Sequence, residues 1–177
     1  SDTWEYDGLS WREVTPSDPE GDGNPSARNA LSVAYDAARG VAVLFGGSGN
    51  SDRLSDTWEY DGVSWREVSP TDPDGDGNPV GRNYVNYAII YDAARGVTVL
   101  FGSEGDSGSL FDTWEYDGLS WREVTPSDPE GDGNPSARYG SAMVYDAARG
   151  VTVLFGGYEE SRYLSDTWEY DGLSWRE

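Results

Sequence analysis

Residues 145–157 read YDAARGVTVLFGG, and residues 166–175 read DTWEYDGLSW. Both stretches recur with a period of about 55 residues. The first begins at Tyr35, Tyr91 and Tyr145, and the second begins at Asp2, Asp56, Asp112 and Asp166. A repeat of this length indicates an array of similar units, each of which buries its apolar surface against its neighbours.

One unit, residues 28–68, predicts four strands and no helix. Residues 29–36 and 41–47 are apolar and rich in β-formers, and residues 56–60 (DTWEY) alternate polar and aromatic side chains. Asp61-Gly62 then indicates a hairpin turn, because glycine supplies the positive φ that such turns need. Residues 63–68 (VSWREV) form the fourth predicted strand.

The chain resembles bacterial kelch-repeat proteins. The resemblance rests on the diglycines Gly46-Gly47 and Gly156-Gly157, on the pair Tyr60-Asp61, and on Trp65. It extends over every repeat, roughly three quarters of the chain. The resemblance implies β-propeller blades, which are four-stranded antiparallel sheets. Two features depart from the pattern: the second unit reads Gly102-Ser103, and the insert between Pro16 and Arg28 is longer than the usual connection.

The predicted fold is therefore all-β, with three full units and an N-terminal half unit. We expect the half unit at 1–14 and the repeat units at 15–68, 69–124 and 125–177. Closed propellers have about four or more blades, so this array does not close a ring by itself. Its open strand edges invite further pairing. Oligomerisation, as a ring or a filament, or a longer repeat array would complete it.

The composition limits the function classes. The net charge is −21, and all twelve basic residues are arginine. Such a surface repels phosphates and anionic headgroups and attracts cations, so we expect no nucleic-acid partner. No apolar run approaches the length of about 20 residues that a membrane-spanning helix needs. Histidine and cysteine are absent, which removes the usual general base and thiol nucleophile and predicts a protein without enzymatic activity.

The acidic inserts are the candidate metal sites. Residues 17–25 (SDPEGDGNP) return as 71–79 and 127–135, with acids at alternate positions before a glycine. This order opens a calcium-binding loop, in which alternate side chains point their oxygens at one ion. The candidate Ca²⁺ ligands are Asp18, Glu20, Asp22, Asn24, Asp72, Asp74, Asp76, Asn78, Asp128, Glu130, Asp132 and Asn134.

Two alternatives to calcium stay open for these inserts. The twelfth position of the calcium-loop pattern is Asn29, Asn83 or Tyr139 rather than glutamate, and no helix flanks the loop. Acidic segments rich in Pro, Gly and Asn also serve as solvated connections. The inserts are therefore calcium sites, structural spacers or protein-recognition loops.

The remaining candidates are aromatic residues and arginines. The tryptophans repeat at two positions of every unit, which favours packing between units over a sugar-binding surface. Arg28, Arg82 and Arg138 precede the first strand of their units, and we expect them to form ion pairs, which contribute little where they are partly exposed. Variation concentrates in the first strand, including 83–90, and in the loop after the second strand. Tyr158, Arg162 and Tyr163 give the third of these loops the best composition for binding a partner.

The sequence therefore predicts a structural or adhesive repeat protein of an extracellular or cell-surface assembly. It would self-associate through its units, with calcium as a candidate stabiliser. The alternative is a kelch module that binds a protein or glycan through the variable loops after the second strand.

Overall fold

The computed structural model describes residues 2–82 and 88–177, and within these ranges the regular structure is entirely β-strand. The strands are β1 (Thr3–Tyr6), β2 (Trp11–Val14), β3 (Ser32–Asp36), β4 (Val41–Ser48), β5 (Arg53–Tyr60), β6 (Trp65–Val68), β7 (Ala88–Asp92), β8 (Val97–Gly105), β9 (Gly108–Tyr116), β10 (Trp121–Val124), β11 (Ala142–Asp146), β12 (Val151–Glu159), β13 (Arg162–Tyr170) and β14 (Trp175–Arg176). The prediction of an all-β fold is confirmed.

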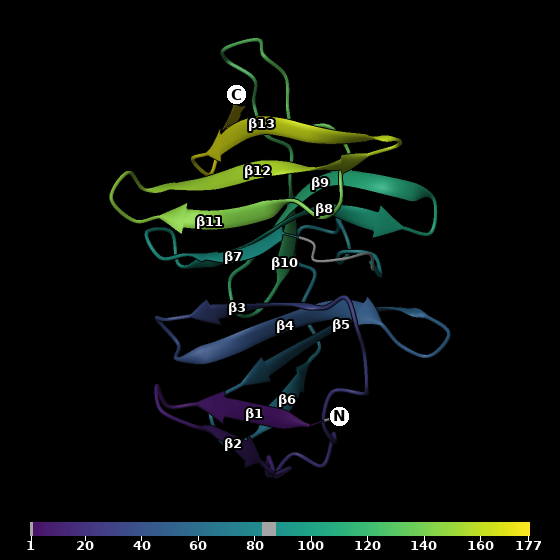
Figure 1. The fold of residues 1–177 in the computed structure, drawn as a ribbon, viewed down its shortest axis with the longest axis vertical. Coiled ribbons are helices and arrows are strands. Elements are labelled where there is room, and N and C mark those ends of the chain that lie inside the picture. The colour runs from purple at the N-terminus through teal and green to yellow at the C-terminus, as the bar shows by residue number, and fades with distance from the viewer. Residues whose placement is uncertain (1, 83–87) are drawn as a thin grey trace.

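The strands form one two-stranded and three four-stranded antiparallel sheets. We call β1-β2 the hairpin unit, β3-β4-β5-β6 unit 1, β7-β8-β9-β10 unit 2 and β11-β12-β13-β14 unit 3. In each sheet, strands that follow one another in sequence are neighbours. Figure 1 shows the sheets stacked from the hairpin unit at one end of the molecule to unit 3 at the other. The predicted four-stranded repeat is thus confirmed.

Short polar motifs close the hairpins. Between β5 and β6, Asp61 Oδ1 accepts hydrogen bonds from the amides of Val63 and Ser64 at 2.8 Å, and Gly62 has a φ of +94°. Between β3 and β4, Asp36 Oδ1 accepts from the amides of Ala38 and Arg39 at 3.0 Å. The aspartates thereby satisfy turn amides that lie outside the strand ladders.

The first strand of unit 1 is shorter than the predicted span of 29–36. Ala30 has a φ of +49°, which ends regular pairing, and Asn29 forms only an isolated bridge with Ser48. The predicted fourth strand, 63–68, likewise loses its first two residues to the turn. Of the variable stretch at 83–90, residues 83–87 lie outside the described residues, and β7 begins at Ala88.

The loop predicted after the second strand is mostly strand. In unit 3, β12 and β13 pair beyond the diglycine as far as Glu159 and Arg162. A bulge between Phe155 and Gly157 shifts the register and lets the hairpin continue. The prediction that Tyr158, Arg162 and Tyr163 lie in a loop is therefore wrong, because the bulge extends the pairing through them.

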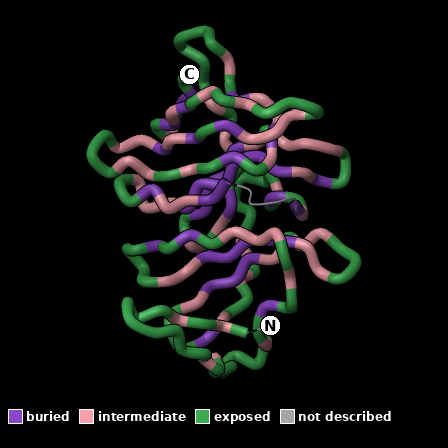
Figure 2. Tube along the Cα trace, in the orientation of Figure 1, coloured by how far each residue is buried: buried purple, intermediate pink, exposed green. Residues whose placement is uncertain are grey.

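The core of the described residues consists of two clusters, one between units 1 and 2 and one between units 2 and 3. The first contains Val43 and Phe45 of unit 1 with Leu100 of unit 2, and the second contains Phe101 of unit 2 with Leu154 of unit 3. Burial accordingly concentrates between the sheets, while the hairpin turns and both ends of the stack are exposed (Figure 2). Among the described residues, no helix is long and apolar enough to cross a membrane.

Candidate functional site

The contacts between neighbouring units repeat one pair of side-chain hydrogen bonds. Between units 1 and 2, Trp121 Nε1 donates to Thr57 Oγ1 at 3.0 Å, and the Tyr116 hydroxyl donates to Glu59 Oε1 at 3.0 Å. The other two contacts contain the equivalent pairs Trp65–Thr3, Tyr60–Glu5, Trp175–Thr113 and Tyr170–Glu115 at 2.9–3.1 Å. We call the side of a sheet that carries threonine and glutamate the receiving face, and the side that carries tyrosine and tryptophan the inserting face.

The DTWEY strand supplies both faces, because successive side chains of a strand point to opposite sides of the sheet. In β9, Thr113 and Glu115 point to the receiving face, whereas Trp114 and Tyr116 point to the inserting face. Tyr116 lies opposite Trp121 of β10, and their rings stack with centroids 5.0 Å apart. The DTWEY strand and the tryptophan of the strand after it therefore make both halves of the contact, which lets every unit bind the next.

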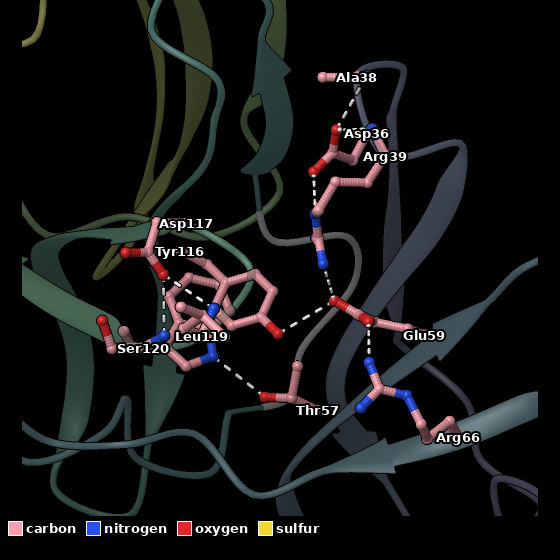
Figure 3. A network of polar contacts seen from close by, with 11 residues as sticks. Asp36, Ala38, Arg39, Thr57, Glu59, Arg66, Tyr116, Asp117, Leu119 and Ser120 are labelled. Atoms are coloured by element: carbon pink, nitrogen blue, oxygen red, sulfur yellow. Dashed lines mark hydrogen bonds and ion pairs between the residues drawn. The ribbon is translucent and has the colours of Figure 1, made fainter.

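Glu59 is the charged centre of the contact between units 1 and 2 (Figure 3). Its carboxylate accepts hydrogen bonds from Arg39 at 2.5 Å and from Arg66 at 2.6 Å, besides the bond from Tyr116. Arg39 also binds Asp36 at 2.6 Å, and its guanidinium lies 5.5 Å from the centroid of the Tyr116 ring. The buried carboxylate is thus balanced by two arginines, as buried charge requires.

The tyrosines of these contacts keep their protons well above neutral pH. Burial and the hydrogen bond to Glu5 raise the pKa of Tyr60 to about 12. Burial and the charge of Glu59 raise the pKa of Tyr116 as well. Since a phenol must be protonated to donate, these hydroxyls keep their donor protons across the physiological pH range.

An arginine clamp lies beside each contact. Arg82 is fully buried, and its guanidinium binds both carboxylate oxygens of Asp112, at 3.0 and 2.8 Å, and the carbonyl oxygen of Gly102. The Arg82 carbonyl accepts a hydrogen bond from the amide of Gly47 in unit 1. The pairs Arg28–Asp56 and Arg138–Asp166 repeat this geometry. The predicted ion pairs are confirmed, and their arginines are buried rather than partly exposed.

The hairpin unit exposes its inserting face. Trp11 is 66 % exposed and Tyr6 is 55 % exposed, whereas the equivalent Trp121 and Trp175 are 1 % and 0 % exposed. The prediction that the tryptophans pack between units is confirmed for units 1 to 3. It is wrong for Trp11, and for Trp4 beside it, because no sheet covers them.

Unit 3 exposes its receiving face. Phe155 is 53 % exposed, whereas the equivalent Phe45 and Phe101 are 0 % and 1 % exposed. Thr167 is likewise exposed, and its equivalent Thr57 is buried. The two outer sheets of the stack therefore expose two different surfaces, whose equivalents are complementary inside the stack.

Comparison with family models agrees with this architecture. The model described as the KLHDC2/KLHL20/DRC7 Kelch-repeats domain matches residues 2–177. The chain belongs to this kelch-repeat family. The four-stranded sheets are thus kelch repeats of the β-propeller type, and a search of curated proteins found no match.

The acidic inserts tie consecutive kelch units together. The amide of Ser17 donates to the Val63 carbonyl at 3.0 Å, so the start of the insert runs beside the last hairpin of the next unit. Asp22 Oδ2 then accepts from the amide of Glu67 in β6 at 2.8 Å, and Asp76 and Asp132 make the same bond to Glu123 and Glu177. Because β6 is the edge of its sheet, this carboxylate pairs an amide that lies outside the strand ladder.

The first acid of each insert binds its own loop. Asp18 Oδ1 accepts from the amides of Gly21 and Gly23 at 2.9 and 3.2 Å, and Asp72 and Asp128 bind the equivalent first glycine. All twelve candidate calcium ligands are exposed. Within residues 2–82 and 88–177, no three acidic side chains gather closely enough to hold a metal ion. Asn83 lies outside the described residues, and calcium binding stays a prediction.

Two of the three residues predicted to bind a partner, Tyr158 and Tyr163, line one surface hollow. Tyr158 packs against Tyr139 and Tyr163, with ring centroids 5.3 and 5.1 Å apart. A hollow of about 500 Å³ opens beside these rings, with Phe155 and Gly157 in its wall. Arg162 pairs with Glu159 of the same hairpin at 2.5 Å and is absent from the lining. The structure thus brings the tyrosines together but not the arginine.

Thr57 and Glu59 were missed as contact residues by the sequence reasoning. A signal for them exists, since threonine and glutamate occupy the same two positions in all four copies of DTWEY. Successive side chains of a strand point to opposite sides of the sheet. Assigning the residues of DTWEY alternately to the two sides places threonine and glutamate on one side and the aromatic residues on the other. Which residues of the next unit these side chains contact depends on how the sheets stack on one another.

Proposed function

We propose that this kelch-repeat chain is a non-enzymatic structural or adhesive protein that self-assembles at a cell surface or outside the cell. The observation that carries the proposal is the contrast between the ends and the interior of the stack. Side chains that are buried at the contacts between full units are exposed on the hairpin unit and on unit 3. Exposed aromatic patches with buried equivalents are typical of interaction surfaces.

The chain contains no cysteine, which fits either side of a membrane. The YDAARGV sequence of the repeat resembles that of bacterial kelch repeats, which supports a bacterial source. The acidic inserts add support for a repeating scaffold, because each one joins two successive units through Asp22 or its equivalent. Calcium is a candidate stabiliser at these inserts, to be tested by calorimetric titration after chelator treatment.

Light scattering of the 177-residue chain over a concentration series tests self-assembly. We expect the molar mass to rise above the 19.3 kDa of one chain as the concentration rises. Electron microscopy of the same samples, with and without chelator, distinguishes rings from filaments. A constant mass of one chain at every concentration would contradict the proposal.

A second candidate function is binding of a glycan or protein by the aromatic hollow of unit 3. The exposed Tyr163 beside Tyr158 favours it, because tyrosine offers a flat apolar ring and a hydroxyl for recognition. Titration of an oligosaccharide panel, followed by tyrosine fluorescence, tests this candidate. Tyr163→Ala should abolish binding, and no response from any sugar would leave self-assembly as the proposed function.

A further inference from the structure

We infer that the inserting face of the hairpin unit docks on the receiving face of unit 3 in a second copy of the chain, head to tail. This inference rests on the self-assembly proposed above and names the surfaces that produce it. The three internal contacts provide the template. In each of them, an inserting face of this composition lies against a receiving face of this composition.

The residues of both hydrogen-bonding pairs of the internal contacts are present at the ends. Thr167 and Glu169 on β13 occupy the positions that Thr57 and Glu59 occupy in unit 1. Trp11 and Tyr6 occupy the positions of Trp121 and Tyr116. Docking therefore lets Trp11 Nε1 donate to Thr167, and it lets the Tyr6 hydroxyl exchange its present bond to the Gly8 carbonyl, 3.0 Å away, for one to Glu169. Residues 2–11 and 112–121 are identical in sequence, so the docking motif is one that already makes this contact inside the chain.

The cation and apolar parts of the contact are available as well. Arg149 binds Asp146 and Glu169, just as Arg39 and Arg95 bind their carboxylates. Arg39 and Arg95 lie 5.5 and 5.1 Å from the centroids of the next unit's tyrosine rings. Arg149 is half-exposed, and Tyr6 of the second copy would supply its ring.

Phe155 completes the receiving face. At the internal contacts, Phe45 and Phe101 meet the edges of Trp121 and Trp175 with centroids 5.3 and 5.2 Å apart. Trp11 of the second copy would cover Phe155 in the same way, which removes two of the exposed aromatic surfaces of the chain.

A two-stranded unit is sufficient for the docking bonds. The hydrogen-bonding pair of each inserting face comes from the last two strands of its sheet, such as β9 and β10 in unit 2. The hairpin unit consists of this pair of strands. Its other face already forms a contact, because Thr3 and Glu5 receive Trp65 and Tyr60 of unit 1.

The two docking surfaces are different, so the interface is heterologous. Each copy offers one inserting face and one receiving face, and assembly continues until the rotation closes a ring or a filament grows. An isologous dimer, in which the same face of both copies meets at the interface, is incompatible with this pairing.

Two complementary variants test the inference. Trp11→Ala removes the inserting anchor, and Thr167→Arg removes the acceptor and places a long cation where the indole docks. Both side chains are exposed in the single chain, so both variants should keep the thermal midpoint of the wild type. Each variant alone should associate about 30-fold more weakly or worse, measured by light scattering. Mixed in equal amounts, they should form a 1:1 pair of twice 19.3 kDa and no larger species.

The control is Leu9→Ala, because Leu9 lies in the turn of the same hairpin and its equivalents Leu119 and Leu173 stay exposed beside internal contacts. It should assemble like the wild type. Tyr6→Phe removes one hydroxyl only and should weaken association even if the larger changes disturb the hairpin. A wild-type chain that stays single overturns both the proposed function and this inference. A wild type that assembles while the variants assemble equally well, or a mixture that stays single, overturns the docking alone.

Discussion

At the residue scale, the second position of each diglycine is a left-handed backbone site beside a neighbouring strand. Gly47 has a φ of +102°, and Ser103 holds the same φ of +102° in unit 2. Serine in place of the second glycine at Gly102-Ser103 therefore leaves the bulge intact. The cost is a backbone conformation that residues with a side chain rarely adopt. In units 1 and 3, glycine avoids this strain.

Gly47→Ala should destabilise the fold more than Gly62→Ala does. Both glycines have a positive φ, +102° and +94°, so both substitutions strain the backbone by about 1 kcal/mol. A Cβ at Gly47 would also lie 2.9 Å from the Asn29 carbonyl oxygen, whereas nothing lies within 4 Å of one at Gly62. We expect a further loss of about 1–2 kcal/mol at Gly47, measured by urea unfolding. Equal losses for the two variants would show that the close approach is relieved without cost.

The arginine clamp of unit 3 should make stability depend on pH below about 4. The hydrogen bond from Arg138 lowers the pKa of Asp166, so the folded state holds this carboxylate ionised more strongly than the unfolded state does. A lowered pKa stabilises the fold above the unfolded value of about 3.9, and the stabilisation disappears as the pH falls through the folded value. The stability difference between wild type and Asp166→Asn should therefore be largest above pH 5 and should shrink toward pH 2.

Urea unfolding of both proteins at a series of pH values measures this difference. Asp74→Asn is the control, because Asp74 is exposed and its substitution also removes one negative charge from a chain with a net charge of −21. A difference for Asp166→Asn that stays constant from pH 7 to pH 2 would contradict the linkage.

At the element scale, the acidic insert and the edge strand of the next unit act together. Asp76 accepts the amide hydrogen of Glu123 at 2.7 Å, on the last strand of unit 2. Asp76→Ala should remove this bond and speed hydrogen exchange of the Glu123 amide about tenfold, which corresponds to a hydrogen bond of about 1.4 kcal/mol. Asp74→Ala, in the same insert, should leave that exchange rate unchanged. Exchange measured by NMR at Glu123 checks both, and an unchanged rate in Asp76→Ala would show that the insert does not hold the edge strand.

At the scale of the whole molecule, charge opposes assembly while the end faces favour it. Each chain carries a net charge of −21, so copies repel one another at low ionic strength. The screening length falls from about 10 Å at 0.1 M salt to about 3 Å at 1 M. Assembly measured by light scattering should therefore strengthen as NaCl rises over this range, and Trp11→Ala should not show the increase. Weaker assembly at high salt would indicate that ion pairs between copies dominate the interface.

Most of the fold could be predicted from the sequence, because the repeat and the strand periodicities are local. The diglycine, the Asp61-Gly62 turn and the alternation of DTWEY all describe neighbouring residues, and the four-stranded sheets follow from them. The hairpin around Tyr158 and Tyr163 was mistaken for a loop, since a bulge that continues pairing has no distinct composition. The acidic inserts were recognised as connections, but their bonds to Glu67 and Glu123 cross between units.

The sequence by itself determined the unit: its length, its four strands, its turns and its membership of a repeating array. Only the tertiary structure decided which face of each strand receives and which inserts, because that depends on the side from which the next sheet packs. It also decided that identical motifs have different surroundings. Trp11 and Trp121 stand at equivalent positions of the same motif, yet one is exposed and the other buried, since burial is a property of the neighbouring unit and not of the residue.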